Sequence, residues 1–362
     1  MTELENARKT IGDIDRKIAA LFEERMDAVS KVAEYKREYG LRVEDTAREQ
    51  ILLTKNCAVI KNEKYKPYYI NFQESVMTVS KSYQHRLLDG VRVAFSGTSG
   101  AFANIAAAKI FPDAECIGYG DFAAAYNAVV SGECDSVVLP LENSVGGDVG
   151  TVMDLCFFGP LSVNGVYETE IIQNLLAIKG TTLDEVKTVI SHPQALGQCA
   201  DYIKKHGFEQ IEAVNTAVAA KHVKESNRHD IAAIGSNLAA EKFGLKVLES
   251  HINQSSTNTT RFAVLSRAAK APSESDDRFI MLFTVKNVAG ALGSAVSIIG
   301  GHGFNLRALK SRPTKELVWN YYFYAEGEGN INSEKGKSML ESLKSCCLDI
   351  KVLGSYEKEI RL

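Results

Sequence analysis

The basic residues near the N-terminus, Arg8, Arg25, Lys36 and Arg48, are of the types that bind carboxylate groups. Most of them lie in a stretch whose apolar residues recur with a helical period, which predicts one long helix. At about 100° per residue, Arg25 and Lys36 differ in direction by only about 20°, whereas Arg8 lies about 100° from Arg25. One chain therefore cannot readily bring Arg8 into the same pocket, and we expect a second copy of the chain to supply it.

Carboxylates and neutral polar side chains accompany these cations. Ser80 and Gln84 are four residues apart, so on a helix they share one face. A set of this kind can hold a small dianion without a nucleophile. For any single cation, a solvated helix face with local salt bridges is the simpler interpretation. The further candidates on the expected second and third helices are Asp45, Glu49, Ser80 and Gln84.

The stretch "NTTRFAVLS", residues 258–266, places two threonines and an arginine at the start of an apolar strand. It holds no His, carboxylate or Cys, so any chemistry there rests on hydroxyl and guanidinium groups. Other polar motifs also lie near predicted strand ends. They are "PLENSVGG" (140–147), "SHPQALGQC" (191–199) and "AAIGSNLAA" (232–240). Because functional groups gather at the carboxyl ends of strands in α/β proteins, we take these motifs as candidates for a functional site.

Segments with different sequence patterns must position the candidate residues. Residues 1–88 lack strand signals and predict three helices, one ending near Gly40, one from about Thr46 and one from Pro67 to about Leu88. Three helices in this arrangement bury little surface, and dimerisation through the long helix would remedy that.

From Val91 onward, short β-rich runs alternate with helical stretches, which indicates an α/β domain. The polar segment 270–277 contains a proline and predicts a linker. Residues 278–356 then predict the element order βαββαβ of a ferredoxin-like domain, with "ELVWNYYFYAE" (316–326) as one of its strands.

Length and composition limit the protein's class. A chain of 362 residues exceeds one compact core, and its net charge of −3 argues against a nucleic-acid-binding face. The N-terminus shows no signal peptide, and no apolar run approaches the roughly 20 residues of a membrane span. The seven cysteines are scattered without metal-type spacing, which is typical of reduced thiols in the cytoplasm.

The helical segment resembles the all-helical chorismate mutases over its whole length. The resemblance rests on "R-x-x-I-x-x-x-D-x-x-I" (8–18), "VEDTARE" (43–49) and "S-x-x-x-Q" (80–84), with the basic residues between them. That family rearranges chorismate to prephenate by holding a dicarboxylate in a reactive conformer, with no covalent intermediate or general base. The resemblance implies that Arg8 of a partner chain, Arg25 and Arg48 bind carboxylates. It implies that Lys36 and Gln84 interact with the ether oxygen. It also implies that Asp45 and Glu49 bind the ring hydroxyl end and that Ser80 contacts the substrate.

The middle segment resembles the prephenate dehydratases over residues 91–267, because the four strand-end motifs occur in order. That family removes the ring hydroxyl and ring carboxylate of prephenate together; aromatisation drives the step, so a weak acid at the hydroxyl suffices. The resemblance implies two α/β lobes like those of type II periplasmic binding proteins, at about 90–168 with 258–267 and at about 170–250. It implies Thr260 as the catalytic donor, and Glu142, Asn143, Ser144, Ser191, Gln198, Arg261 and Phe262 as substrate-binding residues.

The residues leave alternatives open within this segment. Arg261 could pair with a substrate carboxylate or within the fold, and Glu142 could assist protonation or pair with a cation. His192 could act as an acid or only cap a helix. The family's loop "G-P-x-G-[ST]-[FY]-[ST]" is here "GTSGAFA", in which Ala101 and Ala103 replace hydroxyl residues. The substrate could therefore be prephenate or its amino analogue arogenate.

The last segment resembles the ACT domains of these enzymes, pairs of which bind phenylalanine at their interface. The motifs are "GAL" at 290–292, opening a helix, and "SRP" at 311–313, closing a strand. Against the family patterns G-A-L-V and E-S-R-P, this chain has Gly293 and Lys310, and Lys310 reverses a charge. The resemblance implies that phenylalanine is bound by Gly290, Ala291, Leu292, Asn305, Leu306, Ser311, Arg312 and Pro313.

Together these features predict a multidomain protein: an all-α segment over 1–88, a two-lobed α/β domain over 90–267 and an α+β ferredoxin-like domain over 278–356. We expect an enzyme that converts chorismate through prephenate to phenylpyruvate, without metal or organic cofactor, inhibited by phenylalanine. We expect a cytoplasmic homodimer or larger homo-oligomer, with no nucleic-acid or membrane partner. The alternatives are an arogenate-preferring dehydratase, a non-catalytic ligand sensor with the same cleft, and a decarboxylase that keeps the ring hydroxyl.

Overall fold

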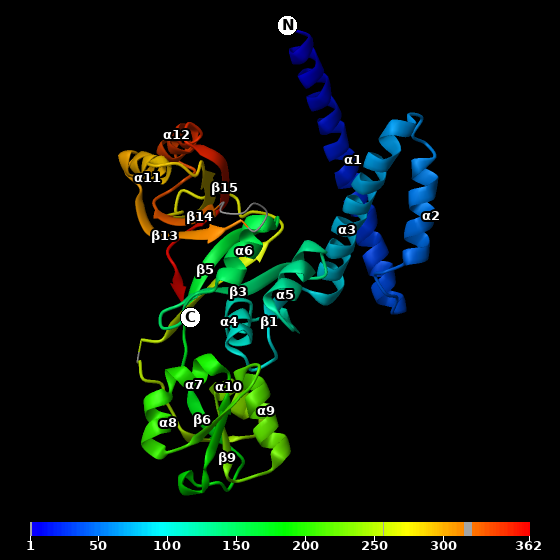
Figure 1. Ribbon diagram of the computed structural model, residues 1–362. Helices are drawn as coiled ribbons and strands as arrows, with labels where there is room; N and C mark the ends of the chain where they lie inside the picture. Colours follow the sequence, from blue (N-terminus) through cyan, green and yellow to red (C-terminus); the bar gives the residue numbers. More distant parts are fainter. Residues whose placement is uncertain (1, 256, 315–320) are drawn as a thin grey trace. The chain divides into compact units, whose positions relative to one another are not determined.

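The computed structural model describes residues 2–255, 257–314 and 321–362, and its chain divides into two compact units. One comprises residues 1–92 with 131–135 and is called the helical unit. The other comprises residues 93–130 with 136–362 and is called the sheet unit, because it contains the β-sheets (Figure 1).

The helical unit is built on one long helix, α1 (Glu3–Tyr39). The helix begins at a capping box formed by Thr2 and Glu5 and ends at Gly40, whose φ of 63° is a left-handed conformation that glycine adopts without strain. Helix α1 packs against α3 (Figure 1). No helix among the described residues, α1 included, has the length and apolarity needed to cross a membrane. The other elements of this unit are α2 (Thr46–Cys57), the 3₁₀ helix η1 (Glu63–Tyr65) and α3 (Lys66–Asp89).

Much of the apolar stripe of α1 is uncovered within the chain. The helix buries Val29 and Ala33, whereas Leu21 is 62% exposed and Ile11 is 58% exposed. A stripe of this kind is stable in water when another apolar surface covers it.

Lobe one of the sheet unit is a mixed sheet with the strand order β16-β5-β11-β3-β1-β2, and β4 pairs with β3. Strand β11 runs antiparallel to both of its neighbours, β3 and β5, so the segment carrying "TRF" lies in the middle of this sheet. The strands are β1 (Arg92–Ser96), β2 (Glu115–Tyr119), β3 (Ser136–Asn143), β4 (Gly147–Asp148), β5 (Ser162–Glu170), β11 (Thr259–Ser266) and β16 (Ile360–Arg361). The helices are α4 (Phe102–Ile110), α5 (Phe122–Val130) and α6 (Gly150–Phe158).

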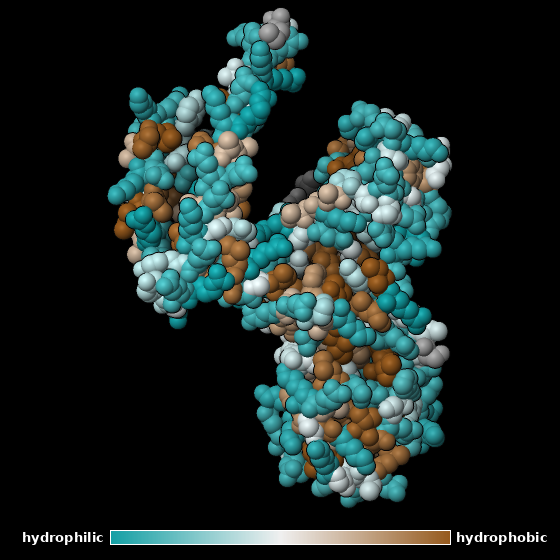
Figure 2. Space-filling view, turned by 180° about the vertical axis from the view of Figure 1, so that it is seen from behind, coloured by the Kyte–Doolittle hydropathy of each residue, from teal (hydrophilic) through white to brown (hydrophobic). Residues whose placement is uncertain are grey.

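Lobe two is a sheet with the order β10-β6-β9-β7-β8 and helices on both faces. Side chains alternate along β6, so Leu175 packs with α7 and α8 while Leu176 packs with α9 and α10. Figure 2 shows hydrophilic and hydrophobic residues interspersed over its visible face, at the bottom of the view. The strands are β6 (Asn174–Ala177), β7 (Thr188–Ser191), β8 (Glu209–Glu212), β9 (Ile231–Gly235) and β10 (Lys246–Glu249). The helices are η2 (Leu183–Glu185), α7 (Pro193–Gln198), α8 (Ala200–His206), α9 (Thr216–Ser226) and α10 (Asn237–Phe243).

The C-terminal domain has the element order βαββαβ and the sheet order β13-β14-β12-β15. Its core joins the strand residues Phe279, Met281 and Phe283 to Ala295 of α11 and Met339 of α12. The first part of the strand predicted at 316–326 lies outside the described residues, and β14 is described from Tyr321. The elements are β12 (Arg278–Val285), α11 (Ala291–Gly301), β13 (Asn305–Pro313), β14 (Tyr321–Glu328), α12 (Glu334–Leu343) and β15 (Cys347–Tyr356).

The other face of this C-terminal sheet packs against lobe one. Tyr322 stacks on Phe157 with ring centroids 4.1 Å apart, and its hydroxyl donates to the Asp154 carboxylate at 2.7 Å. Strand β15 passes so close to β5 that a Cβ added to Gly354 would lie 1.9 Å from the Val163 carbonyl oxygen. The C-terminal domain is therefore joined to lobe one by a buried contact.

The segment between lobe one and the C-terminal domain, residues 270–277, has no helix or strand, as the sequence predicts. It is nevertheless held in place by Asp276, which is buried. The Asp276 carboxylate accepts a hydrogen bond from the Ser355 hydroxyl at 2.7 Å and pairs with Lys270 at 3.2 Å. These contacts of Asp276 hold the linker in place against the C-terminal domain.

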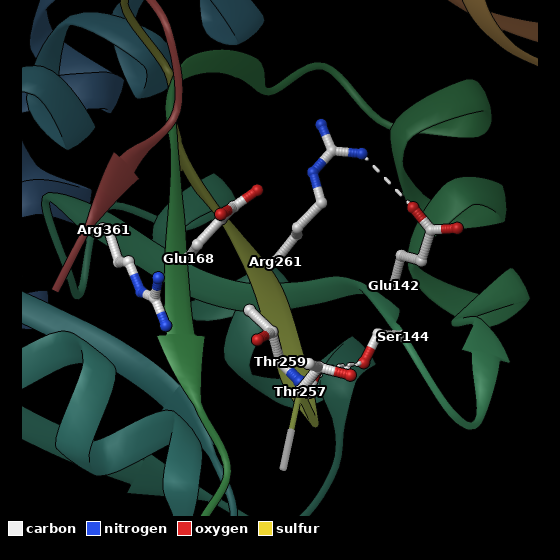
Figure 3. Close-up of a pocket in the computed structure, with 7 residues that line it drawn as sticks. All are labelled: Glu142, Ser144, Glu168, Thr257, Thr259, Arg261 and Arg361. Carbon is white, nitrogen blue, oxygen red and sulfur yellow. Dashed lines mark hydrogen bonds and ion pairs between the residues drawn. The ribbon is translucent and has the colours of Figure 1, made fainter. Parts of the chain in front are cut away.

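Arg261 of β11 lies at the contact between lobe one and the C-terminal domain. Figure 3 shows its side chain paired with Glu142 of lobe one. Its side chain is only 14% exposed and pairs with Glu326 at 2.8 Å, with Glu359 at 3.1 Å and with Glu142 at 3.2 Å. Burial alone would lower the pKa of Arg261, but the nearby Glu326 carboxylate outweighs this, and the pKa is raised. The sequence left open whether Arg261 pairs with a substrate carboxylate or with residues of the protein itself. The structure shows the second alternative.

The tail after β15 brings Glu359 to this cluster, and β16 then pairs with β5 in parallel. The sequence prediction ended the last domain at residue 356 and missed this return to lobe one. A strand of two residues has no apolar alternation that would reveal it.

Replacing Arg261 by Met is expected to lower the free energy of unfolding of the sheet unit by about 3–5 kcal/mol, because among the described residues it leaves the buried Glu326 carboxylate without a cation and with only the Tyr324 hydroxyl as partner. Urea unfolding followed by circular dichroism measures this change. The control is Arg228→Met, which breaks the exposed pair with Asp230 and is expected to change stability little. Equal unfolding midpoints for the two variants would contradict the structural role of Arg261.

Candidate functional site

A cavity of about 630 Å³ lies between lobe one and lobe two and is called the cleft. Strand β11 contributes Thr260 and Phe262, β3 contributes Asn143, and α7 contributes Gln198. The structure therefore brings these four predicted dehydratase residues together in one cavity.

Thr260 is held in the cleft with its hydroxyl proton available. Its side-chain oxygen accepts a hydrogen bond from Asn143 Nδ2 at 2.9 Å, and no described residue accepts its proton. A threonine hydroxyl has one donor and two acceptor lone pairs. Since Asn143 occupies an acceptor position, the O–H of Thr260 remains free to donate to a ligand.

The cleft carries little charge. Its lining residues, all within the described part of the chain, include no Lys or Arg, and Asp148 is their only carboxylate. Helix α4 begins at Phe102 and α6 at Gly150, both of these residues line the cleft, and neither helix has a side-chain cap. Uncapped helix starts present unpaired N–H groups and the positive end of the helix dipole, which favour anions. The site is therefore suited to hold carboxylates by backbone groups.

The loop that departs from the family pattern also lines the cleft, through Ala101 and Ala103. Ala101 is the N-cap of α4 and makes no side-chain hydrogen bond there. A Ser or Thr at this position could occupy the first N–H groups of the helix. The alanine leaves them open to a ligand.

Other predicted residues lie on the opposite side of the sheet. Side chains alternate along β11, so Thr259 and Arg261 point away from the cleft. They line a second cavity, of about 560 Å³, together with Glu142 and Ser144 (Figure 3). The Ser144 hydroxyl donates to the Thr257 carbonyl at 3.0 Å.

Glu142 and Ser191 both have partners within the fold. Glu142 pairs with Arg261 at 3.2 Å and with Lys310 at 3.4 Å, which favours its structural alternative over assistance in protonation. Ser191 is fully buried, and its hydroxyl donates to the Ile234 carbonyl at 2.7 Å. Neither residue lines the cleft.

His192 lines the cleft and is the N-cap of α7. Its Nδ1 accepts a hydrogen bond from the Gln194 backbone N–H at 3.2 Å. The capping alternative for His192 is therefore present in the structure.

In the helical unit, Arg25 and Ser80 meet, because the Arg25 guanidinium donates to the Ser80 hydroxyl. Burial lowers the pKa of Arg25, because desolvation disfavours the charged guanidinium, and an anion beside it would offset this cost. Gln84 is buried on the same face of α3, and its Oε1 has no partner among the described residues. These three residues from α1 and α3 provide a cation, a hydroxyl and a free amide oxygen.

Three of the remaining predicted mutase residues, Lys36, Asp45 and Glu49, have local side-chain partners. Lys36 Nζ donates to the Val43 carbonyl at 2.7 Å, and Glu49 pairs with Lys81 at 3.0 Å. Asp45 caps α2 by accepting from the Arg48 N–H at 2.9 Å. A cavity of about 200 Å³ in this unit is lined by Glu49 and by no other predicted mutase residue. Arg8 is exposed on α1.

The residues proposed to bind phenylalanine lie on neighbouring elements of the C-terminal domain. Gly290, Ala291 and Leu292 are at the start of α11, and Asn305 Nδ2 on β13 donates to Glu328 at 2.9 Å. Arg312 faces lobe one, where it pairs with Asp154 at 2.7 Å and 3.0 Å. The other residues of the predicted set, Leu306, Ser311 and Pro313, lie along β13.

Lys310 also faces lobe one, where it pairs with Glu142 and Asp148. A glutamate at this position, as in the family pattern, would meet two carboxylates. The charge reversal at Lys310 therefore matches the acidic surface that it touches.

Sequence reasoning missed Gln173, which lines the cleft and is 2% exposed. The signal was the "QN" pair at 173–174, which interrupts an otherwise apolar run. It also missed the buried Asn258, whose Oδ1 accepts from Asn143 Nδ2 at 2.8 Å. Buried amides of this kind are revealed by tertiary contacts.

Comparisons with known proteins agree with this division of the chain. The family model for chorismate mutase type II matches residues 7–85, and the one for prephenate dehydratase matches residues 93–270. The bifunctional chorismate mutase/prephenate dehydratase of Buchnera aphidicola subsp. Acyrthosiphon pisum is 31% identical over 369 residues, which is 97% of this chain and 96% of that protein.

Solved structures match about three quarters of the chain. A prephenate dehydratase from Arthrobacter aurescens in complex with L-Phe is 27% identical with a TM-score of 0.69, covering 74% of this chain and 90% of that one. A chain described as GqqA, a novel type of quorum quenching acylase, is 28% identical with a TM-score of 0.69, covering 74% of this chain and 97% of that one. With mutase and dehydratase family models each matching and a bifunctional relative aligned over nearly the whole length, the chain belongs to the bifunctional chorismate mutase/prephenate dehydratase family.

Proposed function

We propose that this chain converts chorismate to prephenate in the helical unit and prephenate to phenylpyruvate in the cleft, and that phenylalanine bound by the C-terminal domain regulates the second step. The observation that carries the proposal is the Thr260 hydroxyl, which faces the cleft with a free proton among neutral donors. Both steps use the substrate's own reactivity, and the protein supplies position and hydrogen bonds.

In the second step, the ring carboxylate leaves as CO2 and its bonding electrons enter the ring. The ring hydroxyl departs and takes up a proton to become water, which restores the charge balance. Thr260 donates a hydrogen bond to the departing oxygen, or relays a proton to it. The driving force is aromatisation, so a strong acid is unnecessary.

The absence of Lys and Arg among the described residues lining the cleft suits this step. A cation firmly paired with the ring carboxylate would stabilise the group that must lose its charge as CO2. Backbone N–H groups at the start of α4 bind an anion with partial charges only. We infer that a substrate carboxylate lies at this helix start.

In the first step, the helical unit holds chorismate by its carboxylates. Arg8 and Arg25 are 17 residues apart on the uninterrupted helix α1, which separates them by about 26 Å at 1.5 Å per residue. Both cannot reach one small molecule from one chain. A partner chain therefore supplies Arg8, and the uncovered apolar stripe of α1 provides the dimer contact.

The proposed roles in this pocket follow from the family resemblance. Arg25 and Arg48 bind carboxylates, and Lys36 with Gln84 stabilises the charge on the breaking ether oxygen. In the structure Gln84 Nε2 donates to the Ser80 carbonyl at 3.4 Å and Oε1 is the atom without a partner among the described residues, so this role requires the amide to turn its N–H₂ to the ligand. Asp45, Glu49 and Ser80 complete the contacts to the substrate.

The C-terminal domain is proposed to bind phenylalanine, which the structural relative from Arthrobacter aurescens holds in its complex. Support for coupling comes from the contacts of β13 with lobe one, through Lys310 to Glu142 and through Arg312 to Asp154. An effector that rearranges β13 would change these contacts and thereby the position of β3 beside Thr260.

We place the protein in the cytoplasm, in keeping with its seven free thiols. We propose prephenate and not arogenate as the substrate, because the relative aligned over 97% of this chain is a bifunctional chorismate mutase/prephenate dehydratase.

Replacing Thr260 by Ala is expected to lower the dehydratase kcat about 100-fold or more, since the hydroxyl leaves without its proton donor. Thr260→Ser is expected to retain most of the rate. A coupled assay from chorismate to phenylpyruvate measures both steps, and mutase activity should be unchanged. The matched control is Thr259→Ala, which removes the neighbouring hydroxyl from the far side of β11. An active Thr260→Ala variant would refute the assigned role, and wild-type protein inactive on both substrates would refute the proposed function.

Mixing Arg8→Ala and Lys36→Met chains is expected to restore mutase activity, although each variant alone loses it. Half of the randomly formed dimers are mixed and each holds one intact site, so roughly a quarter of the wild-type activity should return. Activity is measured after the two chains are unfolded and refolded together. If mixing restores nothing while each variant remains dimeric, Arg8 does not act across the interface.

Saturating phenylalanine is expected to lower the dehydratase rate about fivefold or more and to alter sedimentation, because binding changes the contacts of the C-terminal domain with lobe one. Mutase activity measured in parallel, and leucine in place of phenylalanine, serve as controls. An unchanged rate together with an unchanged sedimentation profile would contradict the assigned effector.

A further inference from the structure

Gln173 lies where the chain crosses from lobe one to lobe two, between β5 and β6, and it lines the cleft. Its backbone is fixed, because its N–H donates to Asn253 Oδ1 at 3.1 Å and its carbonyl accepts from the Ile252 N–H at 2.9 Å. The residue is only 2% exposed. Its side chain therefore projects from a rigid point in the wall of the cleft.

The carbonyl oxygen of this side chain, Oε1, is buried and has no hydrogen-bond partner among the described residues. Leaving a buried acceptor unpaired is unfavourable, and such groups in native proteins need an explanation. At the wall of a binding cleft, the natural explanation is a donor that arrives with the ligand.

The direction of this amide is set by a chain of hydrogen bonds that begins at the backbone. Asn143 Oδ1 accepts from the N–H groups of Val145 at 3.1 Å and Gly146 at 2.7 Å. A backbone N–H can only donate, so this atom of Asn143 must be the oxygen. Asn143 Nδ2 therefore points to Thr260, to which it donates at 2.9 Å.

The hydrogen bonds on the other side of Asn143 fix the orientation of Gln198 and Gln173 in the same way. Gln198 Nε2 lies 3.5 Å from Asn143 Oδ1 as a donor, which turns Gln198 Oε1 toward Gln173. That oxygen accepts from Gln173 Nε2 at 3.1 Å. The nitrogen of Gln173 is thus engaged, and its oxygen is left as an acceptor. This series of hydrogen bonds therefore leaves a hydroxyl donor at Thr260 and an amide acceptor at Gln173 in the same cleft.

The substrate of the proposed dehydration offers few donors. At neutral pH prephenate has two carboxylates and a ketone, all of which only accept hydrogen bonds. Its ring hydroxyl carries its one O–H. An acceptor in the cleft can therefore form a direct hydrogen bond with prephenate only at this hydroxyl.

We propose that Gln173 Oε1 accepts a hydrogen bond from the substrate's ring hydroxyl and so determines specificity for it. This inference rests on the proposed function. The hydroxyl lies between Gln173, which accepts a hydrogen bond from its O–H, and Thr260, which donates a hydrogen bond to its oxygen. Holding the O–H bond toward Gln173 turns a lone pair of the departing oxygen toward Thr260, which is the direction that its protonation requires.

The test uses two unreactive analogues of prephenate with saturated rings, one with the 4-hydroxyl and one without it. Their inhibition constants are measured against the full-length protein and against Gln173→Met, which keeps the size of the side chain and removes the acceptor. Wild-type protein should favour the hydroxylated analogue, and this preference should fall about tenfold in the variant. Gln210→Met, at an exposed position on β8, is the matched control and should keep the wild-type preference.

Mutase activity reports on the integrity of the variant chain, and thermal unfolding reports on the sheet unit. If Gln173→Met does not fold, Gln173→Asn makes the same comparison, because it withdraws the oxygen by about 1.5 Å and keeps the amide. A variant that weakens both analogues equally has lost only a structural contact, and this result overturns the proposal. A changed preference between prephenate and arogenate with an unchanged hydroxyl preference also overturns the proposal, because Gln173 Oε1 then accepts a hydrogen bond from the amino group of arogenate. Wild-type protein that does not turn over prephenate refutes the proposed function instead.

Discussion

The alternation of side chains along β11 is the constraint on which the sheet unit depends. Successive residues of a strand face opposite sides, so Thr260 and Phe262 enter the cleft while Arg261 between them enters a cluster of carboxylates. A shift of one residue in register would exchange these environments and bury the arginine in the neutral cleft. The ion pairs of Arg261 on one side therefore fix the position of the proposed catalytic hydroxyl on the other, and they connect it to the C-terminal domain through Glu326.

The two candidate sites would hold related dianions in different ways. In the helical unit, arginine and lysine side chains from helices provide full charges, which suits a rearrangement that loses no charged group. The cleft presents helix starts, amides and hydroxyls among its described lining residues, and this suits a reaction in which a carboxylate leaves as neutral CO2. The contrast follows from the fate of the substrate's charges in each step.

Much of this organisation could be predicted from the sequence, for identifiable reasons. The long helix with its stop at Gly40 follows from an uninterrupted apolar period, and Thr260, Asn143 and Gln198 belong to motifs at strand ends. The alternation of side chains along β11 would also have placed Arg261 and Thr260 on opposite faces of the sheet, had it been applied to the sequence. The interpretation of Ser191 as a substrate ligand could not be weighed in advance, because its buried bond to Ile234 depends on the pairing of distant strands. The tail at Glu359 and the amide of Gln173 depend in the same way on contacts between segments far apart in the chain.

The position of β16 also affects how the protein is made. The sheet of lobe one combines strands from residues 92–170, 259–266 and 360–361, so its edge cannot be completed on the ribosome until residue 361 has emerged. During synthesis, lobe two can fold earlier, because residues 174–249 form its sheet without later segments. Until the tail arrives, Arg261 lacks Glu359 and the β5 edge is open to pairing with another nascent chain. Translation that stalls before residue 361 would therefore produce polypeptides in which this edge stays unpaired.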